Sequence, residues 1–315
     1  MGVFVLLNGL VGLSSYYLSA ACFGDFGFID FCLTWFTVFF TQVIAVELLL
    51  GSANLLYLPQ ITAAHALILV LAWFCWGKKQ KRAFKIPTLD FILDNRILLL
   101  AAAVFLTFFT VKLAINLVNP PICPETHQYH LSFPAFWFKH GNINNPISLF
   151  GTWPVSAEMT ALTYYPMNAE LLFFWWLLPL KNAFLADVGQ AVFYILGMLA
   201  LYAILRKYAI NKSTACLVSF LWVLIPNLFK QIRNGTQIDV MCAALFLMVL
   251  NYLIIFSRKF GVKYAFILGV TAGIFIGTKV LNVYWIAALL PLAVYFIYRK
   301  IRQEPWSRIV SILAW

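Results

Sequence analysis

The chain has 315 residues, of which 63% are hydrophobic, 17% aromatic and only 10% charged, with a mean hydropathy of +0.88. This composition excludes a soluble globular domain and is typical of a chain that spans a membrane. The formal net charge of +11 does not indicate a nucleic-acid partner. The basic residues lie in short connections between apolar segments, as the positive-inside rule predicts for cytoplasmic loops.

Apolar segments of about 20 residues predict an all-α, polytopic membrane helix bundle. The first segment has no basic region before it and no convincing cleavage site, so we interpret it as a retained helix rather than a signal peptide. A tenth segment begins near Arg308 and stops at Trp315, so we expect the sequence to be incomplete at its C-terminus. The nine complete spans expected are 1–22, 29–51, 60–77, 97–117, 189–206, 214–229, 239–257, 263–278 and 281–298.

Two units are expected along the chain. Residues 1–96 form the N-terminal spans with a basic cytoplasmic connection, and residues 97–315 form a core with an outer loop over 118–188 that carries short interfacial helices. The orientation of the chain in the membrane follows from four basic connections, which alternate with less basic ones and hold 16 of the 22 lysines and arginines. The positive-inside rule places these four connections in the cytoplasm. They begin near Lys78, Arg206, Arg258 and Arg299.

The segment 164–180 decides the topology of everything after it. Its uninterrupted apolar core, Leu171–Leu178, is far shorter than the roughly 20 residues that a span needs, and tryptophans such as Trp175 favour a membrane interface. We therefore expect this segment to lie in the outer interface instead of crossing. The segments 119–142 and 230–239 and the side chain of Lys279 then share the outer side.

The polar loop 119–142 holds three of the four histidines of the chain. Glu125 is the candidate catalytic residue, because a carboxylate that accepts a proton from an attacking hydroxyl contributes about 10²–10⁴ in rate. The alternative is a carboxylate at a helix start after Pro124. His127, Tyr129 and His130 are expected around the substrate.

A metal site in this loop is a second interpretation. Glu125 and His130 are candidate ligands for a divalent ion, but two histidines three residues apart are an insufficient metal pattern, and an interfacial hydrogen-bonding role competes with it. The six cysteines are scattered without a CxxC pair, so neither a metal knuckle nor a disulfide framework is predicted.

Three further charged residues lie in the connections on the predicted outer side. Asp239 starts an apolar segment, and Arg233 lies in the loop before it. Arg233 is therefore a candidate partner for Asp239 or for a phosphate. The alternative for Asp239 is that it only initiates a helix. Lys279 follows glycines at four-residue spacing, which allow close helix approach. An ammonium there suits an anionic phosphate, while snorkelling to the interface is the alternative.

Several of these residues resemble a known family. The run Glu125-Thr-His-Gln-Tyr-His-Leu131 resembles the acidic-xxx-Tyr-His-Leu signature in the first large outer loop of bacterial membrane glycosyltransferases of the GT-C type, in the protein O-mannosyltransferase and aminoarabinose transferase superfamily. Further matches follow in order at Tyr165-Pro166, at Thr236 to Asp239 and at Gly277-Thr-Lys279, so the resemblance covers about residues 120–300.

The resemblance implies an inverting enzyme that moves a sugar from a polyprenyl-phosphate donor to a lipid, polysaccharide or protein acceptor. Its site faces outward from the bacterial cytoplasmic membrane. It assigns Glu125 as the general base and Lys279, helped by Arg233, as the site for the donor phosphate. Glu125 replaces the more usual aspartate, and it stands alone where many relatives carry two adjacent acids, which puts a metal in question. No cofactor is implied as required, and a divalent ion remains an alternative.

A transporter or flippase for lipid-linked or anionic solutes is the competing function. Such proteins carry polar groups and broken helices at mid-membrane. Because the distinctive charges are expected at one face, the sequence favours an interfacial enzyme.

Overall fold

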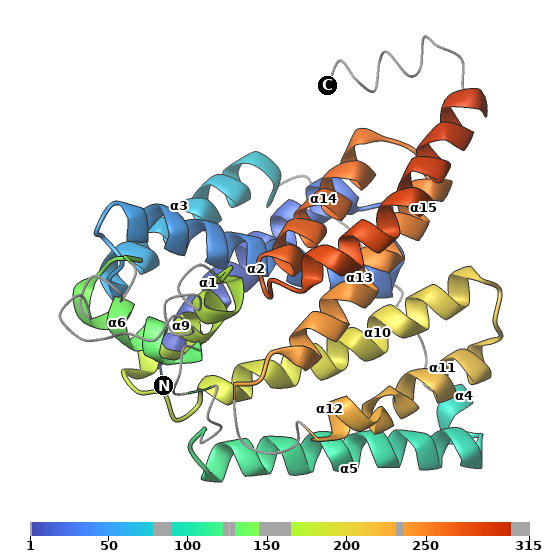
Figure 1. Cartoon of the computed structure of the whole chain (residues 1–315), viewed down its shortest axis with the longest axis horizontal. Helices are drawn as coiled ribbons and strands as arrows, with labels where there is room; N and C mark the ends of the chain where they lie inside the picture. The colour runs from blue at the N-terminus through green and yellow to red at the C-terminus, as the bar shows by residue number, and fades with distance from the viewer. Residues whose placement is uncertain are drawn as a thin grey trace.

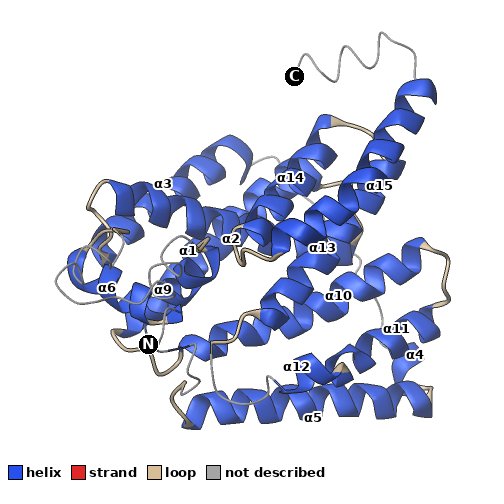
Figure 2. Cartoon of the chain, in the orientation of Figure 1, coloured by secondary structure: helices blue, strands red, loops and turns tan. Residues whose placement is uncertain are grey.

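The protein is described from a computed structural model that covers residues 2–77, 90–121, 126, 130–144, 165–230 and 236–303. All regular elements in these ranges are helices, without a strand (Figure 2). They are α1 (Gly2–Phe23), α2 (Phe28–Ser52), α3 (Leu58–Trp76), α4 (Asp90–Leu93), α5 (Arg96–Val118), α6 (Ser132–His140), α9 (Asn168–Leu180), η3 (Ala186–Gln190), α10 (Ala191–Lys207), α11 (Lys212–Leu221), η4 (Trp222–Leu224), α12 (Pro226–Lys230), α13 (Asp239–Arg258), α14 (Val262–Ile276) and α15 (Asn282–Gln303).

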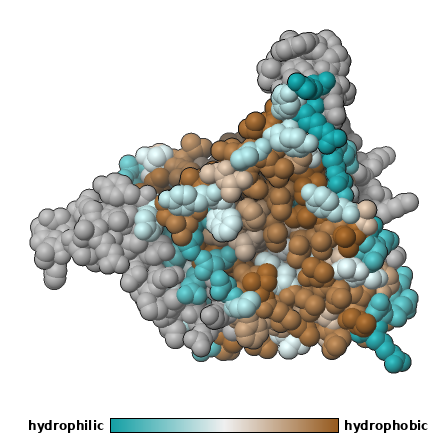
Figure 3. Space-filling model, turned by 45° about the vertical axis from the view of Figure 1, so that its right-hand side comes forward, coloured by the Kyte–Doolittle hydropathy of each residue, from teal (hydrophilic) through white to brown (hydrophobic). Residues whose placement is uncertain are grey.

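Among the described residues, seven helices are long and apolar enough to cross a membrane: α1, α2, α3, α5, η3 continued by α10, α13 and α15. They correspond to seven of the nine predicted spans. Apolar side chains cover much of the face seen in Figure 3. The length and composition of these helices support an integral membrane protein.

The two other predicted spans are shorter helices. The segment 214–229 is divided into α11, η4 and α12, because Pro226 lacks a backbone N–H and disfavours helical geometry at Ile225 before it. The segment 263–278 forms α14, which has 15 residues and ends before Gly277.

Helix starts are set by local side-chain chemistry in two places. The Asn95 side chain accepts hydrogen bonds from the backbone N–H groups of Ile97 and Leu98 at the start of α5. The Asn211 side chain accepts one from Thr214 at the start of α11. Both asparagines thereby satisfy N–H groups that have no partner within their helix.

The core is centred on α13, which packs against α10, α14 and α15 (Figure 1). Within the span window of α13, 72% of the residues are buried, the largest share of the seven long helices. Tyr252 in α13 is fully buried, and its hydroxyl lies 3.1 Å from the Thr34 hydroxyl of α2. α13 therefore connects the N-terminal helices to the rest of the bundle.

One end of the bundle, here called the Lys207 end, is held by ion pairs. Lys207 at the end of α10 donates to Asp30 of α2 at 2.7 Å and to Asn251 of α13 at 2.9 Å. Asp25, between α1 and α2, accepts from Lys263 of α14 at 2.7 Å. The C-terminal ends of α1, α10 and α13 therefore lie with the N-terminal ends of α2 and α14.

The opposite end, here called the Lys279 end, joins the other helix termini. The segment after α14 contacts the start of α13 through Lys279 and Asp239, and it contacts the start of α9 because the Asn168 N–H donates to the Gly277 carbonyl at 2.8 Å. After α9, the backbone carbonyl of Asp187 accepts from Asn116 in the last turns of α5 at 3.2 Å. The start of α9 and the η3 helix that follows it therefore both lie at the Lys279 end.

Candidate functional site

The centre of the candidate site is an ion pair between two residues that the sequence singled out. Asp239 is the first residue of α13, where a carboxylate is favoured by the helix dipole. Lys279 lies just after α14, and its backbone carbonyl accepts from the Asn282 N–H at 2.9 Å. Lys279 Nζ donates to Asp239 Oδ1 at 2.6 Å. The side chains are 33% and 51% exposed, so the pair is accessible from outside.

A pocket of about 500 Å³ opens beside this pair, between the first turns of α13 and the connection from α14 to α15. Its walls are mostly apolar and aromatic, and Asn282 at its edge donates to the Phe275 carbonyl at 2.7 Å. The pocket is lined by Trp222, Ile225, Asn227, Leu228, Asp239, Cys242, Ala243, Phe246, Leu247, Phe275, Lys279, Leu281, Asn282 and Trp285. The arrangement is an apolar groove with one ion pair at its wall.

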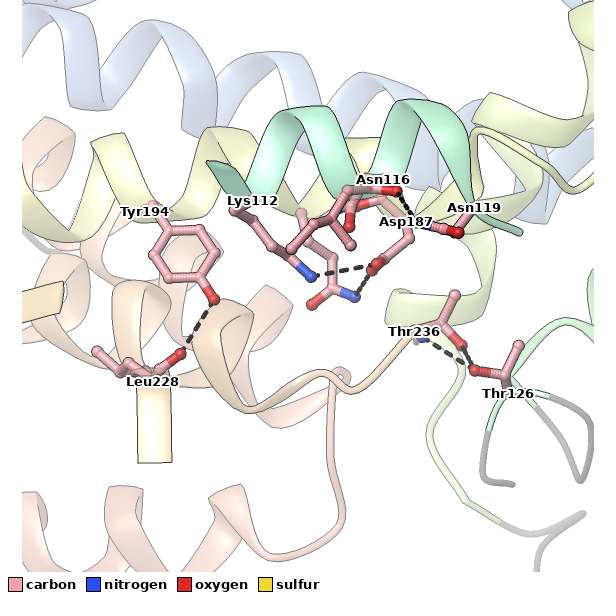
Figure 4. Close-up of polar contacts among 10 residues, drawn as sticks. Lys112, Asn116, Asn119, Thr126, Asp187, Tyr194, Leu228 and Thr236 are labelled. Carbon is pink, nitrogen blue, oxygen red and sulfur yellow. Dashed lines mark hydrogen bonds and ion pairs between the residues drawn. The ribbon is translucent and has the colours of Figure 1, made fainter. Parts of the chain in front are cut away.

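The polar loop 119–142 contacts the segment before α13 through a hydrogen bond between two threonines. Thr126, in the segment after α5, accepts a hydrogen bond from the Thr236 N–H at 3.0 Å, and the two hydroxyls lie 3.1 Å apart (Figure 4). Both residues are fully buried. Thr236 lies three residues before Asp239, and Thr126 directly follows Glu125 in the sequence. The contact therefore links the predicted loop to the start of α13.

His130 has a buried acidic partner that the sequence analysis did not identify. His130 Nδ1 lies 2.6 Å from Glu170 Oε1, and the two side chains are 0% and 3% exposed. The His130 ring also packs edge-on against Phe173, with the ring centroids 6.0 Å apart. A carboxylate bonded to one ring nitrogen fixes the orientation of an imidazole. An acid inside the apolar run 168–180 was the available signal for Glu170.

Glu170 is positioned by a close contact between α9 and α14. Asn168, two residues before it, donates from its side chain to the Ile274 carbonyl at 3.2 Å. A Cβ atom at Gly277 would overlap the Asn168 side chain, so a larger residue there would displace Asn168 from its present position. The same helix end thus positions Glu170 and leads into Lys279.

A second charged pair was also missed from the sequence. Lys112 in α5 donates to Asp187 in η3 at 3.2 Å, and both side chains are only 2% exposed (Figure 4). Gln190 donates to the other Asp187 oxygen at 2.6 Å. A single lysine inside the predicted span 97–117 was the signal for this pair, because a charge at that position needs a partner.

The structure does not describe four of the predicted site residues. Glu125, His127, Tyr129 and Arg233 lie outside the described residues. Within the described ranges, no group of three or more His, Cys, Asp or Glu side chains could hold a metal ion.

Comparison of the chain with protein-family models, with curated proteins and with solved structures found no match. The resemblance to GT-C type glycosyltransferases therefore stays a prediction from the sequence motifs.

Proposed function

We propose that the chain is an integral membrane glycosyltransferase that moves a sugar from a polyprenyl-phosphate donor to an acceptor hydroxyl. The observation that carries the proposal is the meeting of predicted site segments at the Lys279 end. Thr126 contacts Thr236, and Asp239 contacts Lys279, beside a pocket of about 500 Å³. Convergent polar groups at a largely apolar pocket are the usual mark of a ligand site.

The pocket chemistry supports a lipid with an anionic head group as donor. The side chains of Phe246, Phe275 and Trp285 provide apolar walls for a prenyl chain. The Lys279 ammonium provides a cation for the phosphate, and because an ammonium has three donors it can contact Asp239 and a phosphate oxygen together. Arg233, assigned from the sequence, supplies a second cation from the segment before Thr236.

The proposed reaction is a single displacement with inversion at the anomeric carbon. Glu125, assigned from the resemblance, accepts the proton of the acceptor hydroxyl. The acceptor oxygen forms a bond to the anomeric carbon, and the bond from that carbon to the phosphate oxygen breaks, with its electron pair leaving on the lipid phosphate. Lys279 stabilises the negative charge that develops on the leaving phosphate, and stabilisation of developing charge by a fixed group usually contributes more to the rate than any other single effect.

The arrangement of charges supports an outward-facing site. The Lys207 end carries Lys207, Lys259 and Lys263, as expected for a cytoplasmic face. Because the start of α9 and the η3 helix after it both lie at the opposite end, the contacts support a segment 164–180 that does not cross the bilayer. We assign the Lys279 end to the outer face of a bacterial cytoplasmic membrane.

The proposed chemistry is tested by replacing Glu125 with Gln, with Glu125→Asp as the matched control. Isolated membranes are given polyprenyl-phosphate donors with a radiolabelled sugar, and transfer is measured. Glu125→Gln is expected to lose about 10²-fold or more of the rate, because glutamine cannot accept the proton, whereas Glu125→Asp retains measurable transfer. Undiminished turnover by Glu125→Gln contradicts the proposed base. Solute uptake by vesicles without sugar release favours the transporter instead.

A further inference from the structure

A second cavity, separate from the Lys279 pocket, lies among α1, α2, α9 and α10. It has a volume of about 250 Å³. Its lining is dominated by aromatic rings, and none of the described residues that line it is charged. They are Asn8, Gly12, Trp35, Phe36, Phe39, Phe40, Leu172, Phe173, Trp175, Trp176, Gly189, Val192, Phe193 and Met241.

Three polar side chains in the wall, Asn8, Trp35 and Trp175, bond to each other or to the backbone. Trp175 Nε1 donates to the Asn8 side-chain oxygen at 3.2 Å, and Asn8 Nδ2 donates to the Phe4 carbonyl at 2.8 Å. Trp35 Nε1 donates to the Gly12 carbonyl at 2.8 Å. These bonds occupy the indole N–H groups of Trp35 and Trp175 and the Asn8 amide within the protein, which leaves the indole N–H of Trp176 as the remaining polar group contributed by the three tryptophans of the lining. The cavity therefore offers mainly carbon surface to a ligand.

The cavity is accessible from the lateral, apolar side of the bundle. The lining residues Gly12, Phe39 and Val192 are only half-buried and belong to α1, α2 and α10. On a different face of α1, Leu6 and Leu13 are 54% and 53% exposed. Exposed leucines on a helix of spanning length face lipid hydrocarbon. Because the half-buried lining residues also lie on three helices of spanning length, the medium outside the opening is the acyl region of the bilayer.

We propose that this cavity holds part of one acyl chain of a membrane phospholipid. A cavity of about 250 Å³ lined by apolar groups does not hold ordered water, which needs two to four polar partners, and smaller apolar cavities of ~150 Å³ bind hydrocarbons instead. Leaving it empty forfeits the contacts of all the rings around it. The hydrocarbon present at the opening is the lipid acyl chain, so the occupant comes from the bilayer itself.

The bound chain contacts α9 next to the candidate site. Phe173 lines the cavity and also packs against the His130 ring, while Met241 lines it two residues after Asp239. The phospholipid chain thus supports the helices that carry Glu170 and Asp239. This inference does not depend on the proposed glycosyltransferase activity.

The test uses photo-crosslinking in vesicles of phosphatidylethanolamine and phosphatidylglycerol. The vesicles contain a trace of phosphatidylethanolamine with a diazirine in mid-chain, and the labelled residues are mapped by peptide mass spectrometry. Leu172 and Phe173 are 6% and 1% exposed, so a lipid on the outer surface does not reach them. Wild-type protein is expected to be labelled at Leu172 or Phe173 as well as at the exposed Leu6 and Leu13.

Two glycines of α1 provide matched variants. Gly12 lines the cavity and has room for a side chain, since a Cβ there would lie 3.8 Å from Trp35. Gly9 is exposed, with nothing within 4 Å of a Cβ. Gly12→Leu fills the cavity and is expected to reduce label at Leu172 and Phe173 at least tenfold while sparing Leu13. Gly9→Leu is expected to retain the wild-type pattern.

Three results overturn the proposal. The first is wild-type protein that lacks label at Leu172 and Phe173. The second is label at these residues that persists in Gly12→Leu. The third is label that an excess of polyprenyl phosphate removes, because the occupant would then be an isoprenoid. If Gly12→Leu does not fold, Val192→Phe, which fills the cavity from α10, replaces it with the same readout.

Discussion

Lys279 Nζ lies 2.6 Å from Asp239 Oδ1. Lys279, the last residue of the last motif that resembles the GT-C family, thus contacts Asp239, the first residue of α13. The contact joins positions 40 residues apart in the chain. It forms at the wall of a pocket whose other described sides are largely apolar. In this arrangement the Asp239 carboxylate orients the Lys279 ammonium. Under the proposed function, the ammonium would also donate to an anionic lipid head group.

The buried pair His130–Glu170 is expected to support activity beyond its effect on folding. Glu170→Gln replaces the carboxyl group that His130 bonds at 2.6 Å. Loss of a group that orients a histidine at a metal site typically costs about 10- to 100-fold in activity, and a loss of that order is expected here. The measurement is sugar transfer together with thermal unfolding in detergent.

A double variant separates the two roles of this pair. His130→Phe with Glu170→Leu replaces both buried polar groups by apolar ones, which is often neutral for stability. Near wild-type unfolding with transfer still lost supports a role in the site. Full transfer by the double variant shows that the pair serves only packing.

The pair Lys112–Asp187 is expected to stabilise the contact between α5 and η3. Lys112→Met leaves Asp187 buried, with its side chain 2% exposed, and removing one partner of a buried pair costs about 3–5 kcal/mol. Adding Asp187→Asn to Lys112→Met removes the remaining charge and recovers part of the loss. The measurement is the free energy of unfolding in detergent.

Lys212 provides the control for this prediction. It is the exposed first residue of α11, so Lys212→Met changes the same residue type outside the core. Its effect is expected to stay within about 0.5 kcal/mol. If Lys112→Met is no more destabilising than Lys212→Met, the pair contributes nothing measurable.

Asp25 at the Lys207 end makes stability depend on acidic pH. Partial burial acts to raise the pKa of this carboxyl, but hydrogen bonds from Lys263 and Tyr264 outweigh it and lower the pKa from 3.8 to about 2. Because the folded pKa lies below the unfolded value, the stabilisation is fully present above about pH 4 and is lost as the pH falls towards 2. The side chain is 39% exposed, so solvent screening keeps the effect small.

Comparing the melting temperatures of the wild type and Asp25→Asn as a function of pH checks this prediction. The wild type is expected to melt higher at pH 5 to 7, and the difference is expected to shrink between about pH 4 and pH 2. A difference that does not change with pH would show that the carboxylate charge is not its source.

The sequence predicted the long helices well because each is about 20 apolar residues between polar connections. It also predicted Asp239 and Lys279 as candidates, since isolated charges at the ends of apolar segments stand out. Predicting that they touch required the packing of α13 against α14, which local patterns do not contain. The lengths of two predicted spans were wrong, because Pro226 interrupts the span 214–229 and α14 already ends at Ile276.

The partners of His130 and Lys112 could not be predicted for the same reason. Glu170 is 40 residues from His130 in the sequence, and Asp187 is 75 residues from Lys112. Each acid by itself resembles the start of a helix. Only the packing of α9 and η3 at the Lys279 end brings Glu170 to His130 and Asp187 to Lys112. Long-range pairing is set by tertiary packing, and a single sequence does not show which distant residues come into contact.

The proposed function depends most directly on whether the Lys279 pocket binds polyprenyl phosphate. The purified protein is equilibrated with polyprenyl phosphate in mild detergent, and bound lipid is measured by native mass spectrometry for the wild type, Lys279→Arg and Lys279→Gln. We expect one bound lipid in the wild type, retention by Lys279→Arg, and at least tenfold weaker binding by Lys279→Gln, a loss of about 1.4 kcal/mol or more. Equal binding by the wild type and Lys279→Gln, or no binding by either, would contradict the proposed function.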